Sequence, residues 1–523
     1  MKIERTKNAS RNLIFGVIQK VISLGTPFIT RTLMIYFMGV QYLGLNSLFT
    51  SILQVLNLTE LGVGSAMVYS MYKPIAEDDK DMICRLMRLY RTYYRIIGLV
   101  IAVVGCALIP FIPYLIAEDS LNSLPPDINV YILYVLNLAA TVFTYWLFAY
   151  KNCLLNAHQR NDVASKIAAA TNLLQCVLQI VAICAFKNYY LFVIFLLVTQ
   201  ALTNIVTAVI VGKMYPDYKP AGKMPKEKVK EINHRIRDLF TAKLGATMLG
   251  PIDTIVISIF LGLTVLAVYQ NYYYILTAII GVLSIITTAC TAGIGNSIIV
   301  ESKEKNFKDL KKFTFIMAWI VGFCTVCFLC LYQPFMKIWV GEELMLDFIA
   351  VIFFCIYFYV YEINNLLCVY KDAAGMWRED RFRPLAASLA NLVMNLIFVQ
   401  FWGIYGVLAS TFLSMLLIGF PWLIYNTFTV IFERKYLKPY ILKLLFYVFI
   451  TIIACALTYS VCGLIPVQNN WGKLFVNLGI CLIVPNLLFF MIFYRESEFK
   501  DSLRLVDRMT NGKIKFLQKI VKK

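Results

Sequence analysis

Apolar residues along this chain gather into blocks of about twenty or more, separated by short polar segments. A helix of about twenty apolar residues crosses the ~30 Å hydrocarbon core of a bilayer. A soluble core helix of that length keeps a polar face, which these blocks lack. The pattern predicts an all-α polytopic membrane protein with about fourteen transmembrane helices, at 12–38, 43–69, 93–116, 128–150, 162–186, 189–212, 238–260, 265–291, 313–333, 347–369, 384–400, 403–431, 440–464 and 472–494.

The basic residues between the blocks test this count. If the N-terminus is cytoplasmic and the chain alternates sides, nearly all lysines and arginines outside the blocks fall on one side, as in cytoplasmic loops. The other side holds Lys187, Lys337, Lys473 and little else that is basic. A missed or additional helix would invert this pattern partway, so both termini are expected inside, with inner segments 1–11, 70–92, 151–161, 213–237, 301–312, 370–383, 432–439 and 495–523.

Composition agrees with the block pattern. The 523 residues are 60% hydrophobic and only 15% charged, against about a quarter charged in soluble chains. The net charge of +19 comes from the loops, so no nucleic-acid partner is expected. Most of the fourteen cysteines lie inside apolar blocks. Cys324, Cys327 and Cys330 have metal-like spacing, but they sit mid-block among apolar residues, so we expect buried thiols, no metal and no cofactor.

A weak internal repeat divides the chain. Pro27, Gly39, Gly44 and the run Gly62–Ser65 correspond to Pro251, Gly262, Ala267 and the run Gly293–Asn296. Small residues also recur in membrane helices for packing alone, so coincidence remains an alternative. A six-helix repeat keeps its orientation and predicts two pseudo-symmetric lobes around a central cavity. The expected parts are an N-terminal lobe (1–212), a basic cytoplasmic linker (213–237), a C-terminal lobe (238–431), two appended helices (432–494) and a basic amphipathic tail (495–523).

Charged residues inside the blocks are costly in lipid and tend to face a cavity. Lys20 and Lys243 precede the two repeated prolines at nearly the same depth, and Arg31 lies three turns beyond Lys20 on the same helix face. These three cations are the predicted substrate-binding residues, although lysines near a helix end also extend to the lipid head groups. The candidate coupling or pairing residues are Asp253, Glu60 and Glu362, and the uncharged polar residues expected beside them are Asn172, Gln175, Asn391 and Asn395.

No catalytic pattern accompanies these charges. The chain has no glycine-rich phosphate loop ending in Gly-Lys-Ser/Thr. Its two histidines, His158 and His234, fall in predicted cytoplasmic loops without a nucleophile motif nearby and are expected to be solvated. The predicted outer loops are too small for a membrane glycosyltransferase domain. The sequence therefore predicts a transporter without catalytic residues.

Residues 10–110 carry a recognisable motif. It runs Gly39-Val40-Gln41-Tyr42-Leu43-Gly44-Leu45-Asn46-Ser47-Leu48-Phe49, then Thr59-Glu60-Leu61-Gly62-Val63-Gly64-Ser65-Ala66, and ends at Tyr72-Lys73-Pro74-Ile75. This stretch resembles the Wzx-type polysaccharide flippases of the multidrug/oligosaccharidyl-lipid/polysaccharide exporter superfamily. The resemblance implies two six-helix lobes, alternating access and a cationic cavity. It also implies transfer of undecaprenyl-diphosphate-linked oligosaccharides across the bacterial plasma membrane for capsule or another surface glycan.

The physical chemistry of the substrate fits that expectation. A diphosphate cannot cross hydrocarbon unaided, whereas Lys20, Arg31 and Lys243 would neutralise it through charge-assisted contacts. The expected partners are the lipid-linked oligosaccharide, membrane lipids, a polysaccharide polymerase and glycosyltransferases. Two alternatives stay open: a cation-coupled multidrug exporter of the same superfamily, towards which Asp253 points, and a peptidoglycan-precursor (lipid II) flippase.

Overall fold

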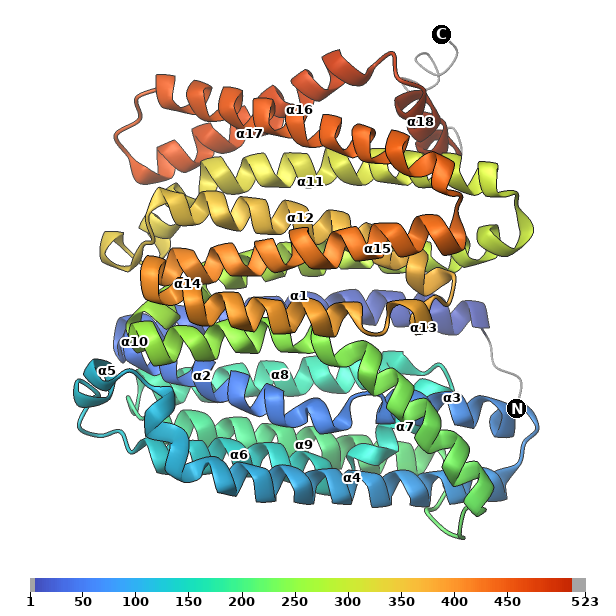
Figure 1. Cartoon of the computed structure of the whole chain (residues 1–523). Helices are drawn as coiled ribbons and strands as arrows, with labels where there is room; N and C mark the ends of the chain where they lie inside the picture. The colour runs from blue at the N-terminus through green and yellow to red at the C-terminus, as the bar shows by residue number, and fades with distance from the viewer. Residues whose placement is uncertain (1–4, 510–523) are drawn as a thin grey trace. The chain divides into compact units, whose positions relative to one another are not determined.

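The computed structural model describes residues 5–509, which form helices and turns and contain no β-strand. Figure 1 labels the helices of the chain, most of which are long. They are α1 (Arg5–Phe37), α2 (Val40–Leu56), α3 (Val63–Ala76), α4 (Lys80–Leu108), α5 (Glu118–Asn122), α6 (Val130–Trp146), α7 (Asn152–Ala157), α8 (Asn161–Cys184), α9 (Tyr189–Met214), α10 (Lys226–Val300), α11 (Lys303–Trp339), α12 (Phe348–Ala373), α13 (Trp377–Asp380), α14 (Arg383–Ser414), α15 (Phe420–Asn426), α16 (Leu437–Leu464), α17 (Asn470–Phe493) and α18 (Ser497–Met509).

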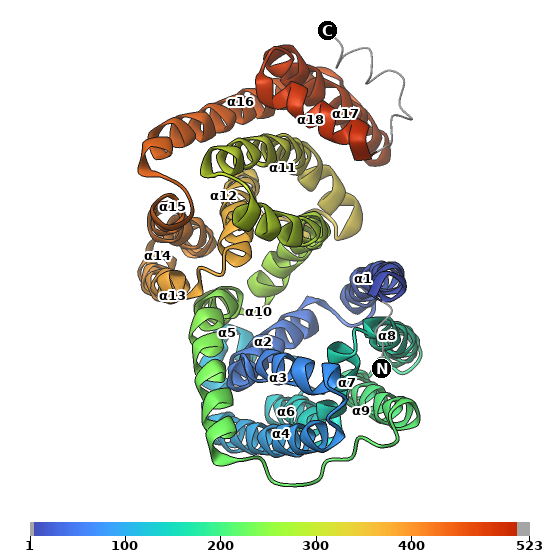
Figure 2. The ribbon, with the colours of Figure 1, turned by 90° about the vertical axis from the view of Figure 1, so that its right-hand side faces the viewer.

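Contacts divide the chain into two compact units, Met1–Gln270 and Asn271–Lys523, which we call the first and second units. In the first unit, α1 packs along α8, α8 along α9, and α6 lies between α4 and α9. Figure 2 views these helices nearly end-on, with α1, α8 and α9 next to one another. The unit boundary lies within α10, so the residues from Lys243 to Gln270 belong to the first unit.

The second unit is organised around α11, which contacts α12, α16 and α17. The helix α18, within the predicted amphipathic tail, also packs on α11. Its Phe499 is buried and stacks on Trp319, with ring centroids 5.8 Å apart. Residues 510–523 of that predicted tail lie outside the described residues.

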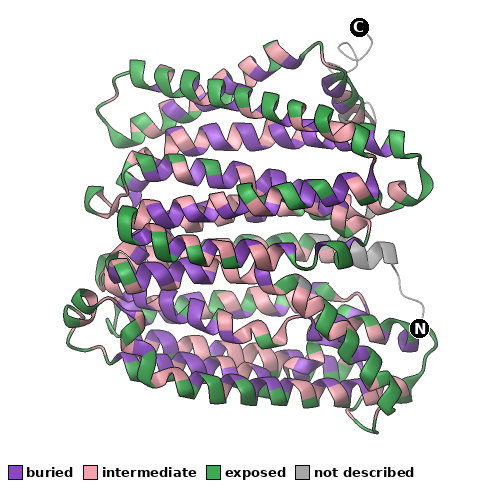
Figure 3. Ribbon diagram, viewed as in Figure 1, coloured by how far each residue is buried: buried purple, intermediate pink, exposed green. Residues whose placement is uncertain are grey.

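The surfaces of the helices suit lipid. Exposed residues follow the outer sides of α4, α16 and α17 (Figure 3). On α17 the exposed large apolar side chains include Phe475, Leu482, Ile483 and Met491. Exposing such side chains to water costs free energy, whereas exposing them to hydrocarbon does not. The exposed surface therefore agrees with the predicted polytopic membrane protein.

Ten helical segments of the described chain are long and apolar enough to cross a membrane, or eleven if the bent pair Val130–Trp146 and Ala149–Ala157 counts as one span. The predicted all-helical, multi-pass class is therefore confirmed. Two of the ten segments, Lys243–Val300 and Trp377–Ile431, each cover all or most of two predicted blocks. The helix α1 is not among the ten, although its 33 residues exceed the length of one crossing.

Glycine breaks explain why predicted blocks are fused. Inside α10 the backbone leaves helical geometry at Gly262, where φ is 84°, a conformation that glycine adopts without strain. The Leu263 amide freed by this break donates to Ser120 Oγ at 3.1 Å, and the Ser258 hydroxyl donates to the Leu115 carbonyl at 2.7 Å. A second break occurs at Gly403 inside α14. Each break therefore joins two predicted blocks through a residue that is not helical.

Candidate functional site

The helix α1 carries two of the predicted cations. Arg31 is half-buried, and its Nη1 donates to the Gln270 carbonyl at 3.5 Å, which links α1 to α10 within the first unit. Lys20 is also half-buried, and its ammonium makes no hydrogen bond or ion pair within residues 5–509. One cation of this helix therefore bonds to a backbone carbonyl, and the other has no polar partner among residues 5–509.

The third predicted cation, Lys243, reaches the motif found in the sequence. Its Nζ donates to Ser65 Oγ at 3.1 Å, and both side chains are exposed. Ser65 lies in the first turn of α3, directly after the Gly62 break, where φ is 88°. A Cβ on Gly62 would lie 2.7 Å from the Leu239 side chain of α10. The motif is thus the place where α10 crosses the start of α3, and this crossing brings Lys243 to Ser65.

Asp253 lies in the same half of α10 and is 1% exposed. Its neighbour Thr254 accepts a hydrogen bond of 2.8 Å from the Gln270 amide, and the Gln270 carbonyl accepts the one from Arg31. Asp253 therefore lies beside the residue pair that holds Arg31. Its role as a coupling or pairing residue stays a prediction.

Glu60 is held by tyrosines of the first unit. Tyr145 of α6 donates to Glu60 Oε2 at 2.7 Å, and the Tyr94 hydroxyl of α4 donates to Glu60 Oε1. Tyr90 donates to Tyr94 at 2.8 Å, and Tyr145 also reaches Asn57. This arrangement ties the turn before α3 to α4 and α6. The hydrogen bonds that Glu60 accepts therefore stabilise that turn.

Glu362 belongs to α12 of the second unit and is 0% exposed. Neither carboxylate oxygen has a hydrogen-bond partner within the described residues, although the Asn365 side chain approaches it. Cys324 of α11 is another close neighbour. An ionisable group buried without a cation is costly in a membrane protein and is a candidate functional residue for that reason.

The uncharged polar residues mostly bond to one another. Gln175 of α8 accepts from Thr199 of α9 at 3.2 Å, so it joins two helices. Asn391 and Asn395 of α14 are buried; Asn395 donates to Asn391 at 3.3 Å and accepts from the Ser410 hydroxyl. Asn172 is half-buried and stays a candidate for contact with a sugar.

The sequence did not single out Asp162, a buried carboxylate of the first unit that has three cationic partners. This side chain is 0% exposed and accepts from Arg160 at 2.9 Å and from Arg11 at 3.1 Å, with the Lys166 ammonium 3.6 Å away. Because Arg11 belongs to α1 and Asp162 begins α8, the pair fixes the start of α1. Asp162 is the first residue of the predicted block 162–186, and this place at the edge of a block gave no signal of ion pairing.

The expectation that His158 is solvated is wrong. The side chain is 5% exposed, and its ring stacks beside Tyr215 and Tyr218 at centroid distances of 4.4 and 5.8 Å. Burial lowers the pKa of His158 below its ordinary value, while its contact with the Leu154 carbonyl opposes that shift. The two tyrosines follow α9 far along the chain, so local sequence could not reveal this cluster. His234, by contrast, is exposed.

The sequence matches a known protein family. A family model described as "Polysaccharide biosynthesis protein" matches residues 9–292, which include the motif, the three cations and Asp253. No curated protein matches the sequence.

Solved structures agree on the fold. A structure described as "Lipid II flippase MurJ, inward closed conformation" aligns with a TM-score of 0.66 at 15% identity, over 92% of this chain and 99% of that chain. An inward-facing multidrug resistance MATE transporter of the MOP superfamily aligns with a TM-score of 0.61 at 15% identity, over 80% and 96%. A MOP superfamily transporter from Pyrococcus furiosus aligns with a TM-score of 0.54 at 14% identity, over 82% and 97%. The chain therefore has the MATE/MurJ-like fold.

Proposed function

This chain belongs to the polysaccharide biosynthesis protein family, a transporter family of the MOP exporter superfamily, and from that premise we propose that it flips lipid-linked oligosaccharides. The substrate is an undecaprenyl-diphosphate-linked repeat unit, which passes from the inner to the outer leaflet of a bacterial plasma membrane by alternating access. The product would supply capsule or another surface polysaccharide. A polymerase and glycosyltransferases are the partners that this pathway requires.

The observation that carries the proposal is the set of cations in the first unit. Lys20 has no partner within the described residues, Lys243 is exposed and held by one neutral hydroxyl, and Arg31 bonds to a backbone carbonyl. None of the ion pairs found in the described chain uses Lys20 or Lys243. A diphosphate offers acceptor oxygens to such donors and gains from their charge, while its polyprenyl tail remains in lipid.

The proposal includes fourteen spans, two six-helix lobes and both termini in the cytoplasm. The breaks at Gly262 and Gly403 support this count, because each divides a fused candidate span into two. The helix α1 and the bent pair from Val130 to Ala157 supply the remaining crossings. Cysteine accessibility labelling from either side of the membrane tests this topology, since fourteen crossings place loops 187–188 and 465–469 on the same outer side.

A complementation experiment tests the function. Cells that lack their own repeat-unit flippase accumulate lipid-linked oligosaccharide and lose surface glycan. Expression of this chain should restore surface glycan and clear the intermediate. Failure to restore glycan in cells whose repeat unit matches the native one, despite normal membrane expression, would refute the proposed activity.

A second candidate is a lipid II flippase, because the MurJ structure covers 92% of this chain with a TM-score of 0.66. Lipid II also carries a diphosphate, so the same cations fit it. Rescue of cells depleted of their lipid II flippase would favour this reading, whereas rescue of surface glycan alone favours the first. A multidrug exporter of the same superfamily would depend on carboxylates such as Asp253 and Glu362, and cation-driven dye efflux would reveal it.

A further inference from the structure

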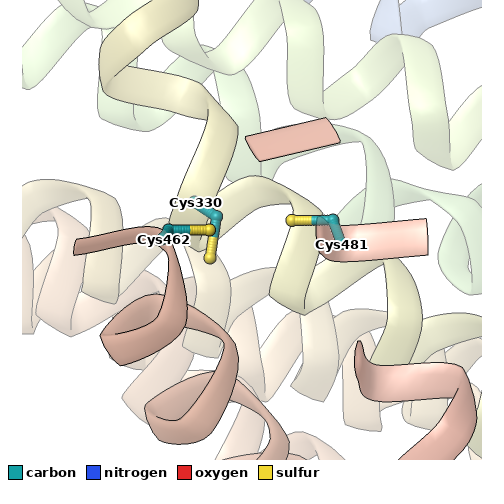
Figure 4. Close-up of side chains that lie close together, drawn as sticks. All are labelled: Cys330, Cys462 and Cys481. Carbon is teal, nitrogen blue, oxygen red and sulfur yellow. The ribbon is translucent and has the colours of Figure 1, made fainter. Parts of the chain in front are cut away.

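Three thiols of the second unit lie together although they are far apart in the sequence. Cys330 belongs to α11, Cys462 to α16 and Cys481 to α17. Their sulfur atoms all lie within 4.8 Å of one another, and the side chains converge in the space between these helices (Figure 4). They are 3%, 7% and 0% exposed. Three helices therefore each contribute one buried sulfur to a common point.

The spacing of the sulfurs suits a single metal ion. Metal–sulfur bonds of ~2.3 Å place the sulfurs of a three-coordinate site about 4 Å apart. The three sulfurs, all within 4.8 Å of one another, lie close to this spacing. No histidine or carboxylate of the described residues belongs to this group. A donor set made only of sulfur selects soft ions such as Cu(I) and, with four ligands, Zn(II).

Ligand number separates these two ions. Structural zinc sites are almost always four-coordinate. A further thiol, Cys327, interacts with Cys481 but does not belong to the group in which all sulfurs are mutually close. Three sulfurs match a trigonal site, and a singly charged ion needs fewer ionised thiols to be neutralised in a buried position.

We propose that Cys330, Cys462 and Cys481 bind one Cu(I) ion. The site joins the α16–α17 hairpin to α11, because each of these helices supplies one ligand. The ion therefore acts as a structural clip for the two helices that follow the repeated part of the chain. Binding replaces thiol protons and releases them to solvent, and no electron transfer is required. The run Cys324–Cys327–Cys330 did not predict this site, since two ligands come from later helices.

The test uses the full-length protein in detergent, kept reduced with ascorbate without oxygen, and Cu(I) itself as the probe against a coloured Cu(I) chelator. Wild-type protein should retain one equivalent of Cu(I). Cys330→Ser, Cys462→Ser and Cys481→Ser should each weaken retention at least about tenfold. Cys106→Ser is the matched control, because this exposed cysteine lies outside the group. X-ray absorption should report three sulfur ligands.

Because some ligand variants can fail to fold, a second measurement tests the proposal with those that remain folded. Cu(I) should raise the thermal unfolding midpoint of wild-type and Cys106→Ser protein, because a ligand that binds only the folded state stabilises it. This shift should be absent in any of the three ligand variants that elutes as a monodisperse peak. Retention of Cu(I) that is equal in wild type and the ligand variants, or no retention by the wild type, would overturn the proposal. Four sulfur ligands around retained Zn(II), with no retained Cu(I), would also overturn it.

Discussion

The Nζ atom of Lys243 lies 3.1 Å from the hydroxyl oxygen of Ser65. This contact joins a predicted substrate-binding lysine of α10 to the Gly-x-Gly-Ser run that begins α3. The hydroxyl can accept from the ammonium without neutralising it, so it positions the charge and leaves it available to a diphosphate. We therefore propose that Ser65 positions Lys243 for a bound diphosphate.

This role predicts an interaction between two substitutions. Ser65→Ala should raise the KM for lipid-linked oligosaccharide about two- to fivefold, because one hydrogen bond to a charged group is lost. Lys243→Gln should raise it about tenfold. In a double-mutant cycle Ser65→Ala should add almost nothing to Lys243→Gln. Strictly additive effects, measured as initial flipping rates in liposomes, would show that Ser65 acts independently of Lys243.

The glycine that precedes α3 is predicted to contribute to the stability of the fold. Gly62 has a φ of 88°, and an added Cβ would contact Leu239 at 2.7 Å. Gly62→Ala should destabilise the protein by about 1–3 kcal/mol, because a left-handed residue is strained even before the clash is counted. Thermal unfolding of the purified variant measures the effect.

The repeat supplies the control for that substitution. Gly293 corresponds to Gly62 in the second half of the sequence, but a Cβ there meets nothing within 4 Å and its φ is not positive. Gly293→Ala should leave stability unchanged or raise it slightly, since alanine favours a helix. Equal losses in both variants would contradict the packing described for Gly62.

The carboxylate of Asp162 is predicted to hold the start of α1 in place through its ion pair with Arg11. Asp162→Asn would leave Arg11, Arg160 and Lys166 facing a neutral amide, and we expect a loss of about 2 kcal/mol, below the ~3–5 kcal/mol of a fully buried pair because the cations are partly exposed. Asp217→Asn, which removes the exposed Lys80–Asp217 pair, is the comparison and should cost less than Asp162→Asn does. A larger loss for Asp217→Asn would contradict this ranking.

His158 predicts a dependence of stability on pH. Burial lowers the pKa of His158, so the unfolded chain binds a proton at a higher pH than the folded one does. The stability that neutral His158 contributes is complete above about pH 6.5 and is lost as the pH falls towards the lowered value. His158→Phe keeps a ring against Tyr215 and Tyr218 but cannot titrate. The unfolding midpoint of wild-type protein should therefore fall more than that of His158→Phe between about pH 7 and pH 5, and identical slopes would refute this role.

Hydropathy predicted the class of fold because lipid offers no hydrogen-bond partners. Each spanning segment must therefore satisfy its backbone polar groups internally, as a helix does. Hydropathy could not predict that the backbone break within α10 falls at Gly262. The break depends on the conformation of this single residue and on the Ser120 hydroxyl, which accepts a hydrogen bond from the freed Leu263 amide. Helix formers such as Lys226, Glu227 and Lys228 also extend α10 into the predicted linker.

Part of the candidate site was also predictable from the pattern of apolar and charged residues. Lys20, Arg31 and Lys243 stand out as charges within apolar blocks, and the Gly62–Ser65 run marked the place that Lys243 reaches. The tyrosines that hold Glu60, the cations around Asp162 and the partners of Cys330 come from distant helices. A single sequence carries no local signal for such tertiary contacts.

The central claim is that cations of the first unit bind the diphosphate of a lipid-linked oligosaccharide. Its most direct measurement is the flipping rate of that lipid by purified protein in liposomes. The triple variant Lys20→Gln, Arg31→Gln, Lys243→Gln should be at least about tenfold slower, a change of ~1.4 kcal/mol, while the exposed triple Lys187→Gln, Lys219→Gln, Lys223→Gln should stay within about twofold of wild type. A cation triple that flips the lipid at the wild-type rate would contradict the account.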